Sequence, residues 1–82
     1  MGMGFETNLT LVQLRQIRKI KQTDLAKELG LSEPGWRRKE NGDNPLLFLE
    51  VQKLCKIYDL SLEEMAIIVG NTLKEKEGKK NN

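Results

Sequence analysis

The chain has 82 residues with 14 basic and 12 acidic side chains, so its net charge is only +2. A chain of this length forms one small domain, and its single cysteine, Cys55, excludes an intramolecular disulfide. Histidine is absent, which removes the commonest general base and metal ligand, and so small a net charge argues for nucleic acid only if the basic residues cluster.

The longest apolar run, residues 65–69, is far too short to span a membrane, and the lone cysteine fits a reducing cytoplasm. We expect a flexible N-terminus at residues 1–7, a folded domain at 8–71 and a polar, disordered tail at 72–82. Apolar residues recur at helical spacing, and the few β-branched residues never alternate with polar ones over a strand length. The sequence therefore predicts a compact all-α domain of five helices.

The first two predicted helices each carry one apolar stripe. Either Asn8 or Thr10 is expected to cap the start of the first helix. The second helix ends before Gly30, a residue type that suits the position after a helix. The stripes are Leu11, Leu14 and Ile17 in the first helix, and Leu25, Ala26 and Leu29 in the second.

The third predicted helix lies in LSEPGWRRKENG, residues 31–42, and begins with a Pro-Gly pair that normally opposes helix formation. With Ser32 as the N-cap, Pro34 is the second helical residue, where its missing N–H breaks no hydrogen bond within the helix. Gly35 costs roughly 1 kcal/mol of helix propensity relative to alanine. The dipeptide at 41–42, Asn-Gly, is typical of a helix end.

The fourth predicted helix has Pro45 in its first turn and ends at Asp59. SLEE at 61–64 predicts a capping box, with Ser61 as the N-cap and Glu64 as the third residue of a last helix that ends at residues 70–71. The apolar residues of the fourth helix are Leu46, Leu47, Leu49, Leu54, Ile57 and Tyr58.

Only GLS separates the second helix from the third, and so short a turn makes the two cross steeply, as in a DNA-binding helix-turn-helix. Three stretches, QTDLAKELGLS at 22–32, ENG at 40–42 and DLSLEEM at 59–65, resemble those of the Cro and phage-repressor family, also called Xre-like. The resemblance covers residues 9–65. It implies a five-helix, lambda-repressor-like fold and a transcriptional repressor that binds a palindromic operator in double-stranded DNA as a homodimer.

The resemblance also implies which residues meet DNA. The recognition helix, residues 33–40, would lie in the major groove, with Arg38 at a base-reading position. Arg15 and Glu40 match an ion pair that joins the first helix to the third. The implied DNA-binding residues are Gln22, Thr23, Ser32, Glu33, Pro34, Gly35, Arg37, Arg38 and Asn41. Of these, Gln22 and Asn41 match positions that hold backbone phosphates.

Several positions in the third helix have two interpretations. Glu33 either complements the helix dipole in the first turn or accepts a hydrogen bond from a cytosine amino group. Trp36 stands where the family has an aliphatic core residue, so we expect it to face inward. Lys39 departs from the family, which has an apolar or aromatic residue there. Either the stem of Lys39 crosses the rim of the core, or the helix is rotated relative to the family.

Residues 65–69 are five consecutive apolar residues on a helix predicted to be short, and one helical face can bury at most three of them. We therefore predict a homodimer interface in the C-terminal region, with Ile67 as its most exposed member. The alternative is a wide buried face or a few scattered exposed apolar residues. The predicted interface residues are Met65, Ile67, Ile68 and Val69.

Two other function classes remain open. One is an antitoxin-like protein-interaction module whose helix-turn-helix serves autoregulation. The other is a degenerate helix-turn-helix that no longer binds DNA, which Pro34, Gly35 and Lys39 would explain. An enzyme is not expected, because the sequence has no glycine-rich phosphate loop or metal-spaced ligand set, and Cys55 has no histidine to activate it. The sequence predicts no cofactor, metal ion, small-molecule ligand or membrane partner. The resemblance implies a bacterial, phage or plasmid origin.

Overall fold

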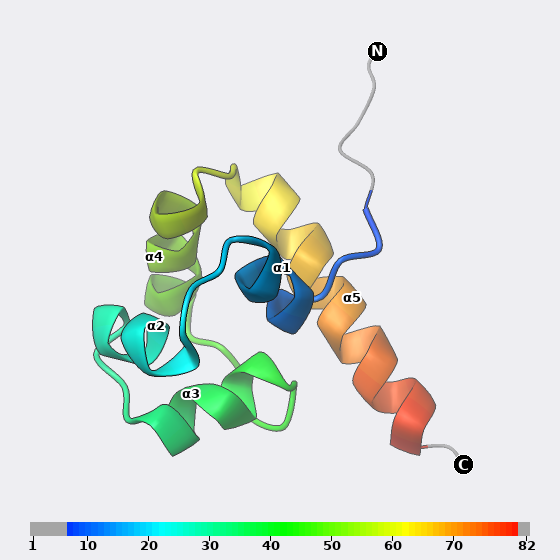
Figure 1. Ribbon diagram of the computed structural model, residues 1–82. Coiled ribbons are helices and arrows are strands. Elements are labelled where there is room, and N and C mark those ends of the chain that lie inside the picture. Colours follow the sequence, from blue (N-terminus) through cyan, green and yellow to red (C-terminus); the bar gives the residue numbers. More distant parts are fainter. Residues whose placement is uncertain (1–6, 81–82) are drawn as a thin grey trace.

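The computed structural model describes residues 7–80, and this part of the chain contains five helices and no strand (Figure 1). The predicted five-helix, all-α architecture is therefore confirmed. The helices are α1 (Leu11–Ile17), α2 (Gln22–Glu28), α3 (Glu33–Glu40), α4 (Phe48–Tyr58) and α5 (Leu62–Lys80). None of them has an apolar stretch long enough to cross a bilayer.

One hydrophobic core joins all five helices. Trp36 of α3 is its largest fully buried side chain, with no exposed surface, and Tyr58 of α4 is the next largest. Because the Trp36 side chain is fully buried in this core, the core fixes how α3 is rotated about its axis. The buried hydrophobic residues are Leu11, Leu14, Leu25, Ala26, Leu29, Trp36, Leu54, Tyr58, Met65 and Ile68.

Local hydrogen bonds set the start of three helices. Thr10, one of the two predicted caps, begins α1: its Oγ1 accepts from the Gln13 N–H at 3.3 Å, and Gln13 Oε1 accepts from the Thr10 N–H at 3.0 Å. Ser32 caps α3. At α5, Glu64 Oε1 accepts from the Ser61 N–H at 2.8 Å, and Ser61 Oγ accepts from the Glu64 N–H at 3.1 Å. The capping box predicted at SLEE is confirmed.

The apolar stripe predicted for α1 is wrong for Ile17, which is not buried. Ile17 is 59 % exposed, whereas Leu11 and Leu14 are buried. Each step of three residues turns a helix by about 300°, so the side chain drifts by about 60° per step. Ile17 therefore lies about 120° from Leu11, and as the last residue of α1 it is followed by no further turn that could cover it.

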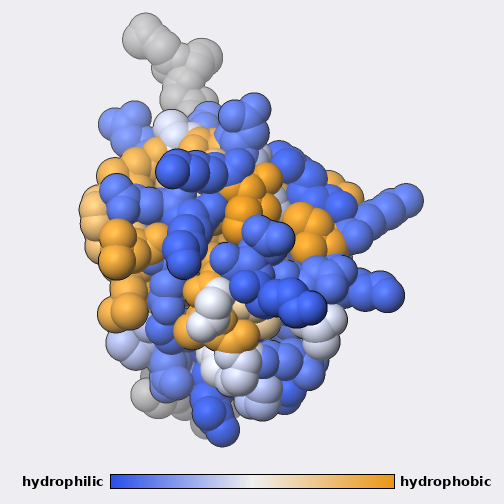
Figure 2. Space-filling model, turned by 90° about the vertical axis from the view of Figure 1, so that its left-hand side faces the viewer, coloured by the Kyte–Doolittle hydropathy of each residue, from blue (hydrophilic) through white to orange (hydrophobic). Residues whose placement is uncertain are grey.

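The start of α4 also differs from the prediction. The helix begins at Phe48, so Pro45 precedes it and is not in its first turn. Glu50 Oε1 accepts from the Leu47 N–H at 2.9 Å, which caps the helix at that point. The buried residues are then Glu50, Leu54 and Tyr58, four residues apart, and Leu49 is 67 % exposed. On the side where α2 and α4 lie, hydrophobic patches interrupt a hydrophilic surface (Figure 2).

Helix α5 does not end at residues 70–71, and residues 72–80 are not the polar, disordered tail that the sequence predicted. Thr72 is buried, and its Oγ1 accepts from the Leu11 N–H at 2.9 Å. Asn71 Nδ2 donates to the carbonyl oxygens of Thr7 at 3.0 Å and Leu9 at 2.9 Å. These contacts attach the segment that precedes α1 to the middle of α5. They stabilise the second half of α5, whose own polar residues would not be enough to keep it helical. The predicted segments at residues 1–6 and 81–82 lie outside the described residues.

Candidate nucleic-acid interface

Helices α2 and α3 form a tight helix-turn-helix along one edge of the molecule (Figure 1). Gly30 follows α2 with a left-handed backbone, φ +74°. The Leu31 N–H then donates to the Ala26 carbonyl at 2.9 Å, which closes the end of α2. Leu31, in the turn between the two helices, packs against the core, and Ala26 of α2 is buried in the core. The small Ala26 side chain lets the two helices approach closely.

The Pro-Gly pair fits the first turn of α3. Ser32 Oγ accepts from the Gly35 N–H at 3.1 Å, and Pro34 is exposed at the second helical position. A Cβ atom at residue 35 would lie only 3.0 Å from Ser32 Oγ. Glycine at residue 35 therefore leaves room for the N-cap hydroxyl of Ser32.

The rotation of α3 separates a buried face from a charged one. Trp36 faces the core, while Glu33, Arg37 and Arg38 are exposed on the outer side. Glu33 Oε2 lies 3.9 Å from Arg37 Nη2, so these two form a loose ion pair one turn apart. The other residues of the implied DNA-binding set, Gln22, Thr23, Ser32, Pro34, Gly35 and Asn41, are exposed or half-buried on the same helix-turn-helix unit.

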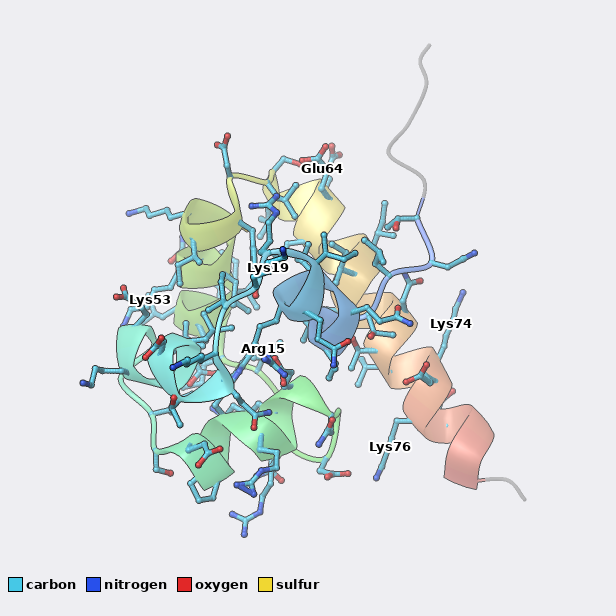
Figure 3. The ribbon with its side chains drawn as sticks, viewed as in Figure 1. Arg15, Lys19, Lys53, Glu64, Lys74 and Lys76 are labelled. Atoms are coloured by element: carbon cyan, nitrogen blue, oxygen red, sulfur yellow. The ribbon has the colours of Figure 1, made fainter. Side chains whose placement is uncertain are left out.

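Behind this face, a buried carboxylate joins three helices. Glu40, at the end of α3, has no exposed surface. Its Oε2 accepts from Arg15 Nε of α1 at 2.7 Å, and its Oε1 accepts from Gln22 Nε2 of α2 at 2.8 Å. Arg15 points from α1 toward α3, and its Nη1 also donates to the Ile20 carbonyl at 2.9 Å (Figure 3). The hydrogen bond to Glu40 holds the Gln22 side chain in place, and it uses only one of the two hydrogens of the side-chain amide group.

A second ion pair, which the sequence did not predict, explains the departure at Lys39. Lys39 Nζ lies 2.8 Å and 2.7 Å from the two carboxylate oxygens of Glu50, and both side chains are mostly buried. Helix α3 is not rotated, because Trp36 still faces the core. The stem of Lys39 crosses the rim of the core to reach α4. Glu50 lies in the first turn of α4, where an acidic residue is common. The sequence did not reveal the ion pair because its partner, Lys39, lies in another helix.

The predicted dimer interface is wrong for two of its four residues. Met65 and Ile68 have no exposed surface, because they point into the protein's own core. Ile67 is 38 % exposed, and Val69 is half-buried against the core. The five consecutive apolar residues thus divide between several faces of α5, and Met65 and Ile68 are unavailable to a second subunit.

Tyr58 lies in the core close to the Glu40 cluster, and its hydroxyl has no hydrogen-bond partner among the described residues. Burial raises the pKa of Tyr58 to about 12 from an ordinary value of 10.0, and the negative charge of Glu40 acts in the same direction. The positive charges of Arg15 and Arg18 lower the pKa but do not outweigh burial. Arg18 also lies over the ring, with its guanidinium carbon 5.6 Å from the centroid.

This raised pKa predicts a loss of stability at high pH. Tyr58 stays protonated longer in the folded state, so its contribution is present below pH 10 and is lost as pH rises towards 12. We expect the unfolding free energy of the wild type to fall by on the order of 2 kcal/mol relative to Tyr58→Phe across this range. Tyrosinate absorbance reports Tyr58 alone, because the chain has one tyrosine. An absorbance midpoint near pH 10 would contradict the assignment.

The family model of the helix-turn-helix domain matches residues 9–66, which is more than half of the chain. The match includes α1 to α4 and the first residues of α5. No match was found among curated proteins or among solved structures.

Proposed function

This chain belongs to the helix-turn-helix domain family, and from that premise we propose that it is a sequence-specific transcriptional regulator that binds double-stranded DNA. The observation that carries the proposal is the rotation of α3. Burial of Trp36 leaves Glu33, Arg37 and Arg38 together on the outer face of the second helix of the motif. In this family of motifs the second helix enters the major groove.

The charges of α3 can take distinct roles in such a complex. An arginine can donate two hydrogen bonds to guanine or one charge-assisted bond to a phosphate, and Glu33 can accept from a cytosine amino group. The ion pair between Glu33 and Arg37 does not oppose this, because a loose, exposed pair contributes at most about 1 kcal/mol. Gln22 and Asn41, at either end of the motif, are suited to hold phosphates and set the docking angle.

Alanine at Arg37 or Arg38 tests this proposal. Each lost phosphate contact should reduce the slope of log affinity against log salt concentration by roughly 0.9. Arg38→Ala should also relax the preference at one base pair of an operator selected from random duplexes. Lys56→Ala removes the same charge from an exposed residue of α4 and serves as the control. If both arginine variants retain wild-type affinity and slope, α3 does not contact DNA.

We further propose that the protein acts as a homodimer on a palindromic operator. Leu62, Ala66, Val69 and Leu73 follow one another on α5 at spacings of four, three and four residues, which puts them on one face of the helix. Leu62 is 48 % and Leu73 is 47 % exposed. This stripe replaces the interface that Met65 and Ile68 cannot form, and it is called the α5 stripe below.

A cleft beside the α5 stripe supports the same assignment. It has a volume of about 290 Å³ and lies between α5 and the segment that leads into α4. Its lining includes Val69 and Leu73 of the stripe, together with the apolar residues Pro45, Leu46 and Val51. A side chain from a second subunit could insert here while its own stripe packs on the first, as a two-fold interface requires. An antitoxin-like interaction with a different protein would use the same surface.

A further inference from the structure

The C-terminal half of α5 packs directly on the turn that follows α3. Gly42 in this turn has a left-handed backbone, φ +85°. A Cβ atom there would lie 3.4 Å from Lys76 Cβ and 3.7 Å from Leu73 Cδ2. Figure 1 shows this half of α5 descending next to the end of α3. The segment predicted to be a disordered tail is therefore in contact with the helix-turn-helix unit.

Lys76 forms an ion pair with Asp43 in that turn. The Asp43 N–H donates to the Arg38 carbonyl at 2.8 Å, which holds the backbone of Asp43 at the charged end of α3. Asp43 also lies two residues after Asn41, one of the implied phosphate contacts. In Figure 3, Lys76 points from α5 towards the α3 side of the molecule, whereas Lys74 points away from it.

An exposed carboxylate at this place opposes DNA binding, because it repels the phosphate backbone. Both Asp43 and Lys76 are about two-fifths exposed, so neither charge is hidden from a duplex docked on α3. We propose that Lys76 neutralises Asp43 and that the C-terminal half of α5 thereby supports DNA binding by the helix-turn-helix unit. This inference rests on the proposed function and adds a residue outside the helix-turn-helix motif to it.

Four variants test the proposal by titration of a random-sequence duplex and of the selected operator. Lys76→Met exposes the Asp43 charge, and we expect it to weaken binding to both duplexes roughly three- to tenfold at moderate salt. Lys74→Met removes the same charge from the same helix and should leave affinity near that of the wild type. Asp43→Asn should bind at least as tightly as the wild type. The double variant, Asp43→Asn with Lys76→Met, has the wild-type net charge and should recover wild-type affinity.

The outcomes separate this inference from the proposed function. If the wild type binds no duplex, the proposed function fails and this inference fails with it. If the wild type binds and Lys76→Met equals Lys74→Met, only this inference is overturned. If the double variant stays as weak as Lys76→Met, Lys76 acts without Asp43 and the inference is also overturned. Thermal melting of each variant, followed by circular dichroism, checks that a weakened protein is still folded.

Discussion

Glu40→Ala is expected to lower the free energy of unfolding by about 3–5 kcal/mol, because it leaves a buried cation without its partner. The Glu40 carboxylate has no exposed surface and accepts from both Arg15 and Gln22. Removing it leaves Arg15, which is only 14 % exposed, with one remaining hydrogen bond to the Ile20 carbonyl. The loss also releases Gln22, so DNA affinity should fall even where the variant is folded.

Urea unfolding followed by the fluorescence of Trp36 measures this loss, since the chain has one tryptophan and it is buried. Glu33→Ala is the matched control, because it removes the same charge from the exposed face of the same helix and should change stability by less than about 1 kcal/mol. Glu40→Gln, which retains the size of the side chain but loses its charge, should have a free energy of unfolding between those of Glu40→Ala and Glu33→Ala. Equal unfolding midpoints for Glu40→Ala and Glu33→Ala would refute the structural role of the cluster.

Leu73→Glu is expected to produce a folded monomer whose operator affinity is lower by on the order of 100-fold or more. Leu73 lies in the α5 stripe and is 47 % exposed, so a charge there costs the isolated subunit little. In a dimer, the two charges would meet at a desolvated apolar interface. The operator would then be bound by one helix-turn-helix unit at a time, without the gain from two linked half-sites.

Sedimentation over a range of concentrations, combined with operator titration, checks both parts of this result. Ile67→Glu is the matched control, since Ile67 is on α5 but about 120° around the helix from Leu73. It should leave the dimer intact, in contrast to the interface first predicted from sequence. A Leu73→Glu variant that remains dimeric would exclude the stripe. Recovery of a different protein in stoichiometric amounts with the wild type would favour the antitoxin-like alternative.

Features that depend on residues a few positions apart could be predicted from the amino-acid sequence. The caps at Ser32 and Ser61 involve hydrogen bonds that span three residues, so their side-chain types are visible in a short window. The short turn after α2 is equally local. The outward direction of Arg37 and Arg38 was predictable because one neighbour, Trp36, is large and apolar, and its burial sets the rotation of the whole helix.

Features that depend on partners far away in the chain could not be predicted, because those partners meet only when the helices pack. Helix α5 continues past residue 71 because Thr72 bonds to Leu11, which is 61 positions away in the chain. The start of α4 depends on Glu50, whose burial is offset by Lys39 from another helix. Met65 and Ile68 are core residues because α1 and α4 cover that face of α5. Polar side chains and apolar runs have no fixed burial of their own: their place follows from the free energy of contacts that exist only once the helices have packed.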